Sequence, residues 1–139
     1  MQLGTFGAIL KFASELEDAA SNFYDEAAKK SSPEVQKIFS DFANASKKNK
    51  QLIERTRRME MQEMVLEAIT GIDSDNYKTD TSICAEEKKN VVKAIEIEST
   101  IKRFYEDSMG KLGFLPNVKR TLAKLAAEKQ ERIKRLQGL

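Results

Sequence analysis

The chain has 139 residues, which suits a single domain, and its 40% hydrophobic and 33% charged fractions are typical of folded globular proteins and exclude a disordered one. The net charge of +2 is too small to indicate a nucleic-acid partner. The chain contains one cysteine, Cys84, so an internal disulfide is excluded, and it contains no histidine, the commonest metal ligand and acid–base group.

Two segments in the first half carry apolar residues at three- and four-residue spacing, which predicts a helical hairpin over residues 5–58. Thr5 is a candidate N-cap for the first helix. Ser32 and Pro33 mark a stop and restart, with Ser32 as N-cap and Pro33 at the first position of the second helix. The inward stripe expected for the first helix is Ile9, Ala13, Leu16, Ala20, Phe23 and Ala27.

Residues 59–80 are expected to form a crossover connection that travels the length of the bundle, because it must join two helices that run in the same direction. Residues 59–70 either form a separate short helix after a bend between Arg57 and Gln62, which we favour, or continue the second helix to Gly71. Three methionines near this point either pack on the bundle or form an adaptable partner surface: Met59, Met61 and Met64.

A second helical hairpin is expected over residues 81–137, with Thr81 or Ser82 as the N-cap of its first helix and Pro116 opening its second. A shift of 81 positions aligns the first helices of the two halves and places Glu17 on Glu98 and Tyr24 on Tyr105, and a shift of 83 aligns the second helices. No segment alternates at period two. The sequence therefore predicts an all-α, single-domain bundle over residues 1–139, built from two pseudo-symmetric hairpins and a long crossover connection.

Two segments carry a family resemblance: FASELEDAASNFYDEAAKK (12–30) and AIEIESTIKRFYEDSMGK (94–111). In each, a glutamate is followed six and seven residues later by Phe-Tyr. This pattern, together with the helix order along nearly the whole chain, resembles the rubrerythrin-like branch of the ferritin-like superfamily. That resemblance implies a four-helix bundle and a di-iron or di-manganese site, made of two single glutamates and two Glu-x-x-His pairs.

Carried over by position, the resemblance makes Glu17 and Glu98 the two single glutamates. The positions of the paired ligands are occupied by Ser46 and Asn49 in the second helix and by Lys129 and Arg132 in the fourth. A hydroxyl and an amide are weak ligands, and an ammonium and a guanidinium have no lone pair to offer a metal. We therefore expect a degenerate site that holds no metal.

The charges of these residues suggest what replaces the metal. Glu17 and Glu98 carry two negative charges, which Lys129 and Arg132 balance, and burying the glutamates without partners would be costly. A central salt-bridge cluster, with Ser46 and Asn49 as hydrogen-bonding neighbours, resolves this. Two tyrosines flank the site, and they are either core-edge aromatics, which we favour, or redox-active or hydrogen-bonded to the glutamates: Tyr24 and Tyr105.

We accordingly expect a protein that is not an enzyme and has no cofactor, a structural or protein-interaction module that forms a homodimer with an unknown protein partner. One alternative is residual iron or manganese binding by Glu17 and Glu98 with Glu15, Glu96 or Glu128. Another is a polyanion-binding module that uses basic surfaces within 47–58 and on the last helix.

These surfaces carry no nucleic-acid motif, so solvated faces and inter-helix pairs are the favoured interpretation and nucleic acid is not an expected partner. Cys84 is expected to be an inert apolar residue rather than a redox thiol. With no apolar run near the ~20 residues that span a bilayer and no signal-peptide pattern over Met1–Leu10, we expect no membrane association and a cytoplasmic location.

Overall fold

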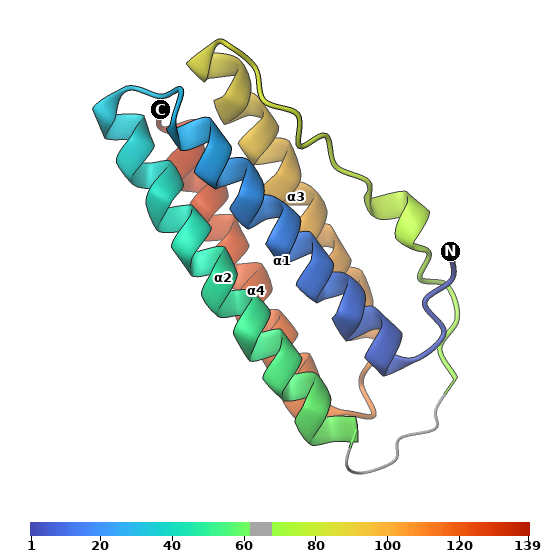
Figure 1. Cartoon of the computed structure of the whole chain (residues 1–139). Coiled ribbons are helices and arrows are strands. Elements are labelled where there is room, and N and C mark those ends of the chain that lie inside the picture. Colours follow the sequence, from blue (N-terminus) through green and yellow to red (C-terminus); the bar gives the residue numbers. More distant parts are fainter. Residues whose placement is uncertain (62–67) are drawn as a thin grey trace.

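A computed structural model describes residues 1–61 and 68–139. Four long helices account for most of it: α1 (Phe6–Ala28), α2 (Pro33–Met61), α3 (Glu87–Lys111) and α4 (Pro116–Gln137), with a short 3-10 helix, η1 (Ser74–Tyr77), between α2 and α3 (Figure 1). Within the described ranges the only β pairing is an isolated bridge between Gln2 and Asp73. The predicted all-α bundle is confirmed.

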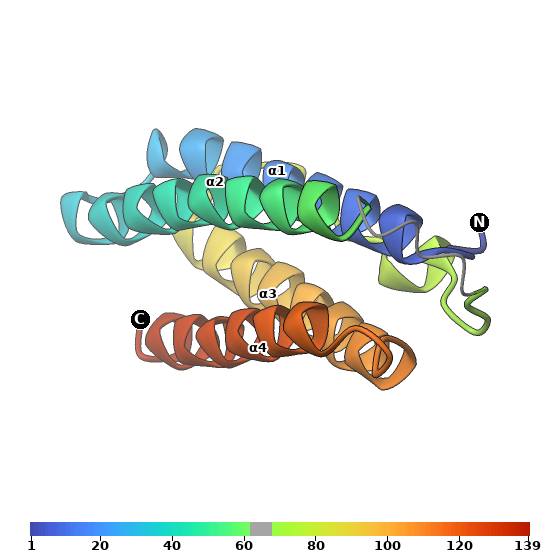
Figure 2. The same ribbon diagram turned by 90° about the horizontal axis from the view of Figure 1, so that it is seen from below.

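The helices form two antiparallel hairpins, α1 with α2 and α3 with α4 (Figure 1). Viewed from below, α1 and α2 form one layer and α4 lies on the opposite side, while α3 crosses obliquely from beneath α1 and α2 to the start of α4 (Figure 2). Helices α2 and α3 run in the same direction, so the connection returns along the bundle from the end of α2 to the start of α3. This confirms the predicted pair of hairpins and the long crossover.

Local sequence signals place three of the four helix starts correctly. The Thr5 hydroxyl accepts a hydrogen bond from the amide of Ala8 at 3.0 Å, so Thr5 is the N-cap of α1. Helix α2 begins at Pro33, and the carbonyl of Ser32 accepts the amide of Gln36 at 2.8 Å. Helix α4 begins at Pro116, where the fixed φ of proline suits a first helical position.

The predicted start of the third helix at Thr81 or Ser82 is wrong, because α3 begins at Glu87. The polar groups before it are satisfied outside a helix. The Asp80 carboxylate accepts both the amide (3.0 Å) and the hydroxyl (2.6 Å) of Ser82. The side chain of Asn90 accepts from the Cys84 amide at 2.8 Å and donates to the Cys84 carbonyl at 3.0 Å. These bonds hold residues 80–84 as a non-helical segment against α3.

The crossover is attached to the bundle at two places. The amide of Leu3 donates to the carbonyl of Ile72 at 2.8 Å, and the amide of Ile69 donates to the carbonyl of Gly4 at 2.9 Å. The Tyr77 hydroxyl donates to Asp107 on α3 at 2.6 Å, and burial, followed by this carboxylate, raises the pKa of Tyr77 to about 12. The connection is therefore held against α3 and the segment before α1.

Residues 68–70 are not helical, so a second helix that runs unbroken to Gly71 is excluded. The favoured short helix within residues 59–70 falls mostly on residues 62–67, outside the described residues, as do Met64 and the Gln62 end of the expected bend. Helix α2 itself extends to Met61, past the expected hairpin end at residue 58. Met59 is 63% exposed, so it does not pack on the bundle.

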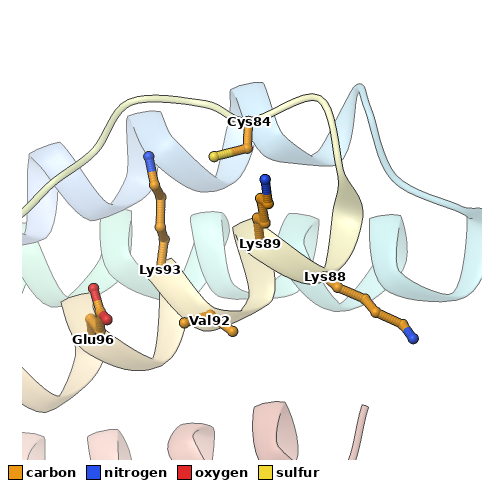
Figure 3. Close-up of a pocket in the computed structure, with 6 residues that line it drawn as sticks. All are labelled: Cys84, Lys88, Lys89, Val92, Lys93 and Glu96. Atoms are coloured by element: carbon orange, nitrogen blue, oxygen red, sulfur yellow. The ribbon is translucent and has the colours of Figure 1, made fainter.

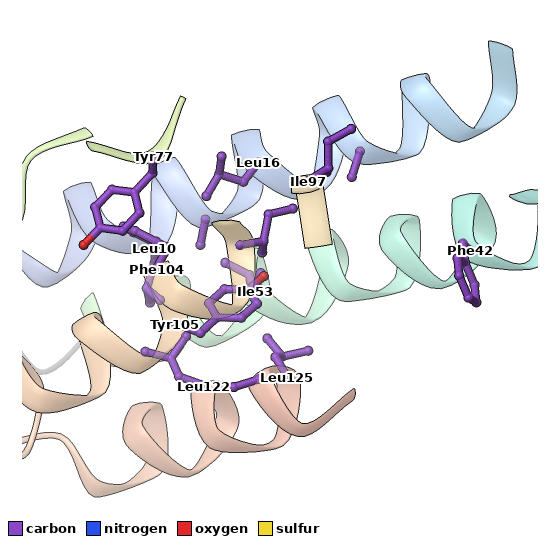
Figure 4. Close-up of a cluster of buried hydrophobic side chains, with 14 of the residues drawn as sticks. Leu10, Leu16, Phe42, Ile53, Tyr77, Ile97, Phe104, Tyr105, Leu122 and Leu125 are labelled. Carbon is purple, nitrogen blue, oxygen red and sulfur yellow. The ribbon is translucent and has the colours of Figure 1, made fainter. Parts of the chain in front are cut away.

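The hydrophobic core lies between the four helices and confirms the predicted inward stripe of α1 (Figure 4). Side chains from all four helices meet there, among them Leu10, Ile53, Phe104 and Leu122. The core also contains buried polar and charged side chains, which form the candidate site. In the part of the chain that the structure describes, no helix has the length and apolar character needed to cross a membrane.

Candidate functional site: a buried ion-pair cluster

Four charged side chains meet in the middle of the bundle, and we call them the central cluster: Glu17 from α1, Glu98 from α3, and Lys129 and Arg132 from α4. The exposed fraction is 0% for the first three and 5% for Arg132. Ser46 and Asn49 on α2, also buried, border it. All six side chains are buried, as the predicted salt-bridge cluster requires.

Lys129 lies between the two glutamates. Its Nζ donates to Glu17 Oε1 at 2.6 Å and forms an ion pair with Glu98 Oε2 at 3.1 Å. Glu98 Oε2 accepts no hydrogen bond from the described residues, so the ion pair with Lys129 compensates its charge. The lysine ammonium thus bridges the carboxylates of α1 and α3 from a third helix.

Arg132 neutralises the other side of the cluster. Its Nη1 lies 3.3 Å from Glu98 Oε1 and donates to Ser46 Oγ at 3.2 Å. Its Nη2 donates to Glu128 Oε1 at 2.8 Å, and the guanidinium carbon lies 5.4 Å from the centre of the Phe42 ring. Ion pairs, a hydroxyl and an aromatic face therefore surround the buried guanidinium.

Asn49 completes the hydrogen bonding of the cluster. Its Nδ2 donates to Glu17 Oε2 at 3.1 Å and to Glu128 Oε1 at 3.4 Å. Sequence reasoning placed Glu128 only among the carboxylates that a residual metal site would recruit, and missed its role as a partner of Arg132 and Asn49. The spacing of Glu128 and Arg132, four residues apart on one helix, is the signal that could have revealed it.

Two tyrosines bind the glutamates crosswise. Tyr24 on α1 donates to Glu98 Oε1 on α3 at 2.7 Å, and Tyr105 on α3 donates to Glu17 Oε2 on α1 at 2.9 Å. Both tyrosines are fully buried, so the interpretation as core-edge aromatics is wrong, and the hydrogen-bonded alternative holds. The reciprocal pairs follow the pseudo-twofold relation of the halves, since the tyrosine of each hairpin binds the glutamate of the other.

Burial and the neighbouring carboxylates set the ionisation of the tyrosines. Burial raises the pKa of Tyr24 well above its ordinary value, and the charge of Glu98 raises it further. The pKa of Tyr105 is raised in the same way by burial and by Glu17. Both hydroxyls therefore stay protonated and remain hydrogen-bond donors at neutral pH.

The cluster is electrically balanced and favours its charged form. Burial acts to raise the pKa of Glu98, but Lys129 and then Arg132 outweigh burial, so that the pKa lies below its ordinary value. Burial acts to lower the pKa of Arg132, and Glu98, Glu17 and Glu128 raise it above its ordinary value. Two buried carboxylates thus face two buried cations, and the partly exposed Glu128 adds a charge that solvent can reach.

The residues present do not fit a di-metal centre. Between the two glutamates lies an ammonium group, which has no lone pair and repels cations. Across residues 1–61 and 68–139, no group of three or more Cys, Asp or Glu side chains is placed to hold a metal ion. The chemistry that this donor set supports is charge neutralisation and hydrogen bonding within the core.

Cys84 lies outside the cluster, in a pocket of about 380 Å³ on the outer side of α3 (Figure 3). Lys89 and Lys93 extend toward it in Figure 3, while Lys88 points away. The Lys93 ammonium is already engaged, since its Nζ donates to the carbonyl (2.8 Å) and hydroxyl (2.6 Å) of Ser82. The half-buried thiol has no histidine or second cysteine with which to form a catalytic pair.

Several of the basic side chains singled out in the sequence pair with acidic ones. Between α2 and α1, the pairs are Lys47–Asp25 at 3.2 Å and Lys50–Asp18 at 3.1 Å. Arg135 of α4 lies 3.9 Å from Asp41 of α2. These pairs favour the interpretation of the charged stripes as solvated faces and inter-helix contacts.

Comparison with known proteins supports the fold. No protein-family model matches the chain, and no curated protein matches it. A solved structure from Thermotoga maritima, described as that of a candidate ferritin-like diiron-carboxylate protein, superimposes with a TM-score of 0.76 over 99% of this chain and 93% of its own, at 18% identity. At this identity the likeness concerns the path of the backbone alone, and the chain accordingly has the ferritin-like fold.

Proposed function

We propose that this protein is a non-catalytic ferritin-like module in which Lys129 and Arg132 take the structural place of metal ions. The observation that carries the proposal is the position of the Lys129 ammonium, 2.6 Å from Glu17 and 3.1 Å from Glu98. In a ferritin-like di-metal site, the metal ions neutralise inward-facing carboxylates. Here the side chains of Lys129 and Arg132 neutralise the two glutamates. The bundle that they stabilise would then serve as a rigid helical surface for a protein partner.

The competing candidate is a residual iron or manganese site that uses Glu17 and Glu98 with a recruited carboxylate. Glu128 is the carboxylate nearest to that role, but its Oε1 is bound to Arg132 at 2.8 Å and to Asn49 at 3.4 Å. A metal at this place would have to displace the ammonium from both glutamates and remain beside the guanidinium. The observed ion pairs therefore support the metal-free proposal.

The test is elemental analysis of protein purified without chelator, followed by titration with iron(II) and manganese(II) under anaerobic conditions. We expect substoichiometric metal and no saturable binding. Glu17→Gln and Glu26→Gln provide a matched pair, because both lie on α1 but only Glu17 is buried, and Glu26 is not a candidate metal ligand. Stoichiometric metal that is lost in E17Q and kept in E26Q would overturn the proposal, because it would place a metal in the central cluster.

Two finer assignments belong to the same proposal. The glutamate followed by Phe-Tyr in both hairpins supports the rubrerythrin-like branch, with Glu17 and Glu98 as the remaining carboxylates of a degenerate site. We also propose that the module acts as a homodimer, because apolar side chains stay exposed on the single chain, including Val92 at 56% and Leu139 at 45%. Sedimentation equilibrium tests this, and a single species of one-chain mass at micromolar concentration would refute it.

A further inference from the structure

Three basic side chains differ from the paired ones described above. Lys11 on α1 and Arg57 and Arg58 on α2 form no ion pair with any of the described residues. All three line one pocket of about 360 Å³ between α1 and α2, which we call the α1–α2 pocket. Its other lining residues are Leu10, Ser14 and Glu54. The pocket thus brings together three cations and one carboxylate, and it shares no residue with the central cluster.

Arg57 is held in place by the backbone of α1. Its Nε donates to the carbonyl of Gly7 at 3.0 Å, which fixes the plane of the guanidinium against the first turn of α1. The guanidinium lies close over α1, since a Cβ at Gly7 would be in ordinary van der Waals contact with Nε and Nη2 of Arg57, at 3.6 Å from each. With Nε engaged, the two Nη groups remain as a fork of donors, the arrangement that recognises phosphate or carboxylate oxygens.

The helix dipole does not account for this group of cations. Arg58 lies in the last turn of α2, where a cation is stabilised by the partial negative charge of the helix end. Lys11 lies near the start of α1, where a cation gains nothing from the dipole. Lys11 lies beside two arginines and raises the positive potential of the pocket, and it forms no ion pair of its own in the part of the chain that the structure describes.

The remaining lining residues of the pocket supply hydrogen-bond acceptors and an apolar contact. Glu54 accepts a long hydrogen bond from Ser14 at 3.5 Å, and both side chains face the same space as the cations. A carboxylate and a hydroxyl at this position can accept hydrogen bonds from ligand hydroxyl groups, while the buried side chain of Leu10 adds an apolar contact. A volume of about 360 Å³ suits a small molecule rather than a nucleic-acid duplex.

We propose that the α1–α2 pocket binds a small phosphate-bearing molecule that also carries hydroxyl groups, with Lys11, Arg57 and Arg58 holding the phosphate and Glu54 and Ser14 the hydroxyls. Three cations match a phosphate monoester, which carries nearly two negative charges at neutral pH. A simple carboxylate carries one charge, and the repulsion from Glu54 offsets much of its attraction.

The test is isothermal titration of the full chain with glycerol 3-phosphate at low and physiological salt, with glycerol and inorganic phosphate as matched probes. We expect saturable binding of glycerol 3-phosphate, weaker binding of phosphate that competes with it, and none of glycerol. Arg58→Gln should weaken binding about tenfold or more, the loss expected for a charged hydrogen bond. Lys119→Gln, an exposed cation on α4, is the control and should leave binding unchanged.

Arg57 also contacts the backbone of α1, so Arg57→Gln could lower the stability of the fold. The thermal unfolding of R57Q is therefore compared with that of the unmodified protein before its binding is measured. Lys11→Gln, at an exposed position, supplies a second variant that leaves the fold intact. Absence of saturable binding to either phosphate probe would overturn the proposal. So would binding that K11Q and R58Q leave unchanged, or binding that K119Q weakens equally, because the latter would indicate diffuse surface charge. None of these results bears on the metal-free proposal for the central cluster.

Discussion

Replacement of Lys129 by methionine removes the ammonium from the central cluster while keeping a side chain of similar volume. Glu17 and Glu98 then remain fully buried with Arg132 as their single buried cation. Removing one partner of a buried ion pair costs about 3–5 kcal/mol, because it leaves an uncompensated charge in the core. Domains of this size are stable by roughly 5–15 kcal/mol, so K129M is expected to lose a large part of its free energy of unfolding.

The assay is urea denaturation at pH 7 followed by circular dichroism, with Lys119→Met as the control on the exposed face of the same helix. K119M should change the free energy of unfolding by no more than about 0.5 kcal/mol. Adding Glu17→Gln to K129M should recover part of the loss, because the second change removes the charge that the first left unpaired. A loss below about 1 kcal/mol in K129M would refute the reasoning, since the ammonium would then not be neutralising buried charge.

Three further predictions follow from the same geometry. Arg132→Ala should cost about 3–5 kcal/mol in denaturant titration, and a loss below about 1 kcal/mol would contradict the buried pairing. The pKa of Glu98 is lowered in the folded protein. Its contribution to stability is therefore present above its pKa in the unfolded chain, near 4, and is lost as the pH falls through its pKa in the folded protein. Glu98→Gln should accordingly reduce the loss of stability at acid pH in a profile of unfolding free energy against pH. The pKa of each of the three tyrosines is raised in the folded protein, and that of Tyr77 is about 12. Unfolded tyrosines ionise near pH 10, so the free energy of unfolding should fall as the pH rises above about 10. Ultraviolet titration should then show phenolate absorbance rising together with unfolding, and a native-state rise near pH 10 would contradict the burial of Tyr24 and Tyr105.

The fold could be predicted from the sequence because it depends on regular helical spacing, whereas the membership of the central cluster is what the family resemblance implies. The resemblance implies that Glu17, Glu98, Lys129 and Arg132 share one interior, and helical register places Glu17 and Glu98 on the inward stripes of their helices. The proline at the start of α2 and of α4 fixed the register of two helices. The same resemblance gives Ser46 and Asn49 as neighbours of the cluster.

The contacts that sequence reasoning missed are those that depend on rotation between helices or on tertiary competition for polar groups. The crosswise pairing of Tyr24 and Tyr105 requires the relative rotation of α1 and α3, which spacing along one helix does not give. The predicted start of α3 is wrong because the side chain of Asn90, on α3, binds the backbone of Cys84 and stabilises a non-helical segment there. Ser82 reads locally as a helix cap but is engaged by Asp80 and Lys93 instead.

The positions of the cluster residues along the chain also bear on the order of folding. Each hairpin joins neighbouring segments, whereas Glu17 and Lys129 are 112 residues apart. Contacts between distant segments require the closure of long loops and tend to form late. The ion pairs should therefore be largely absent from the transition state, so that K129M speeds unfolding far more than it slows refolding. The central cluster therefore forms after the hairpins and slows unfolding, so it contributes to the kinetic stability of the native state.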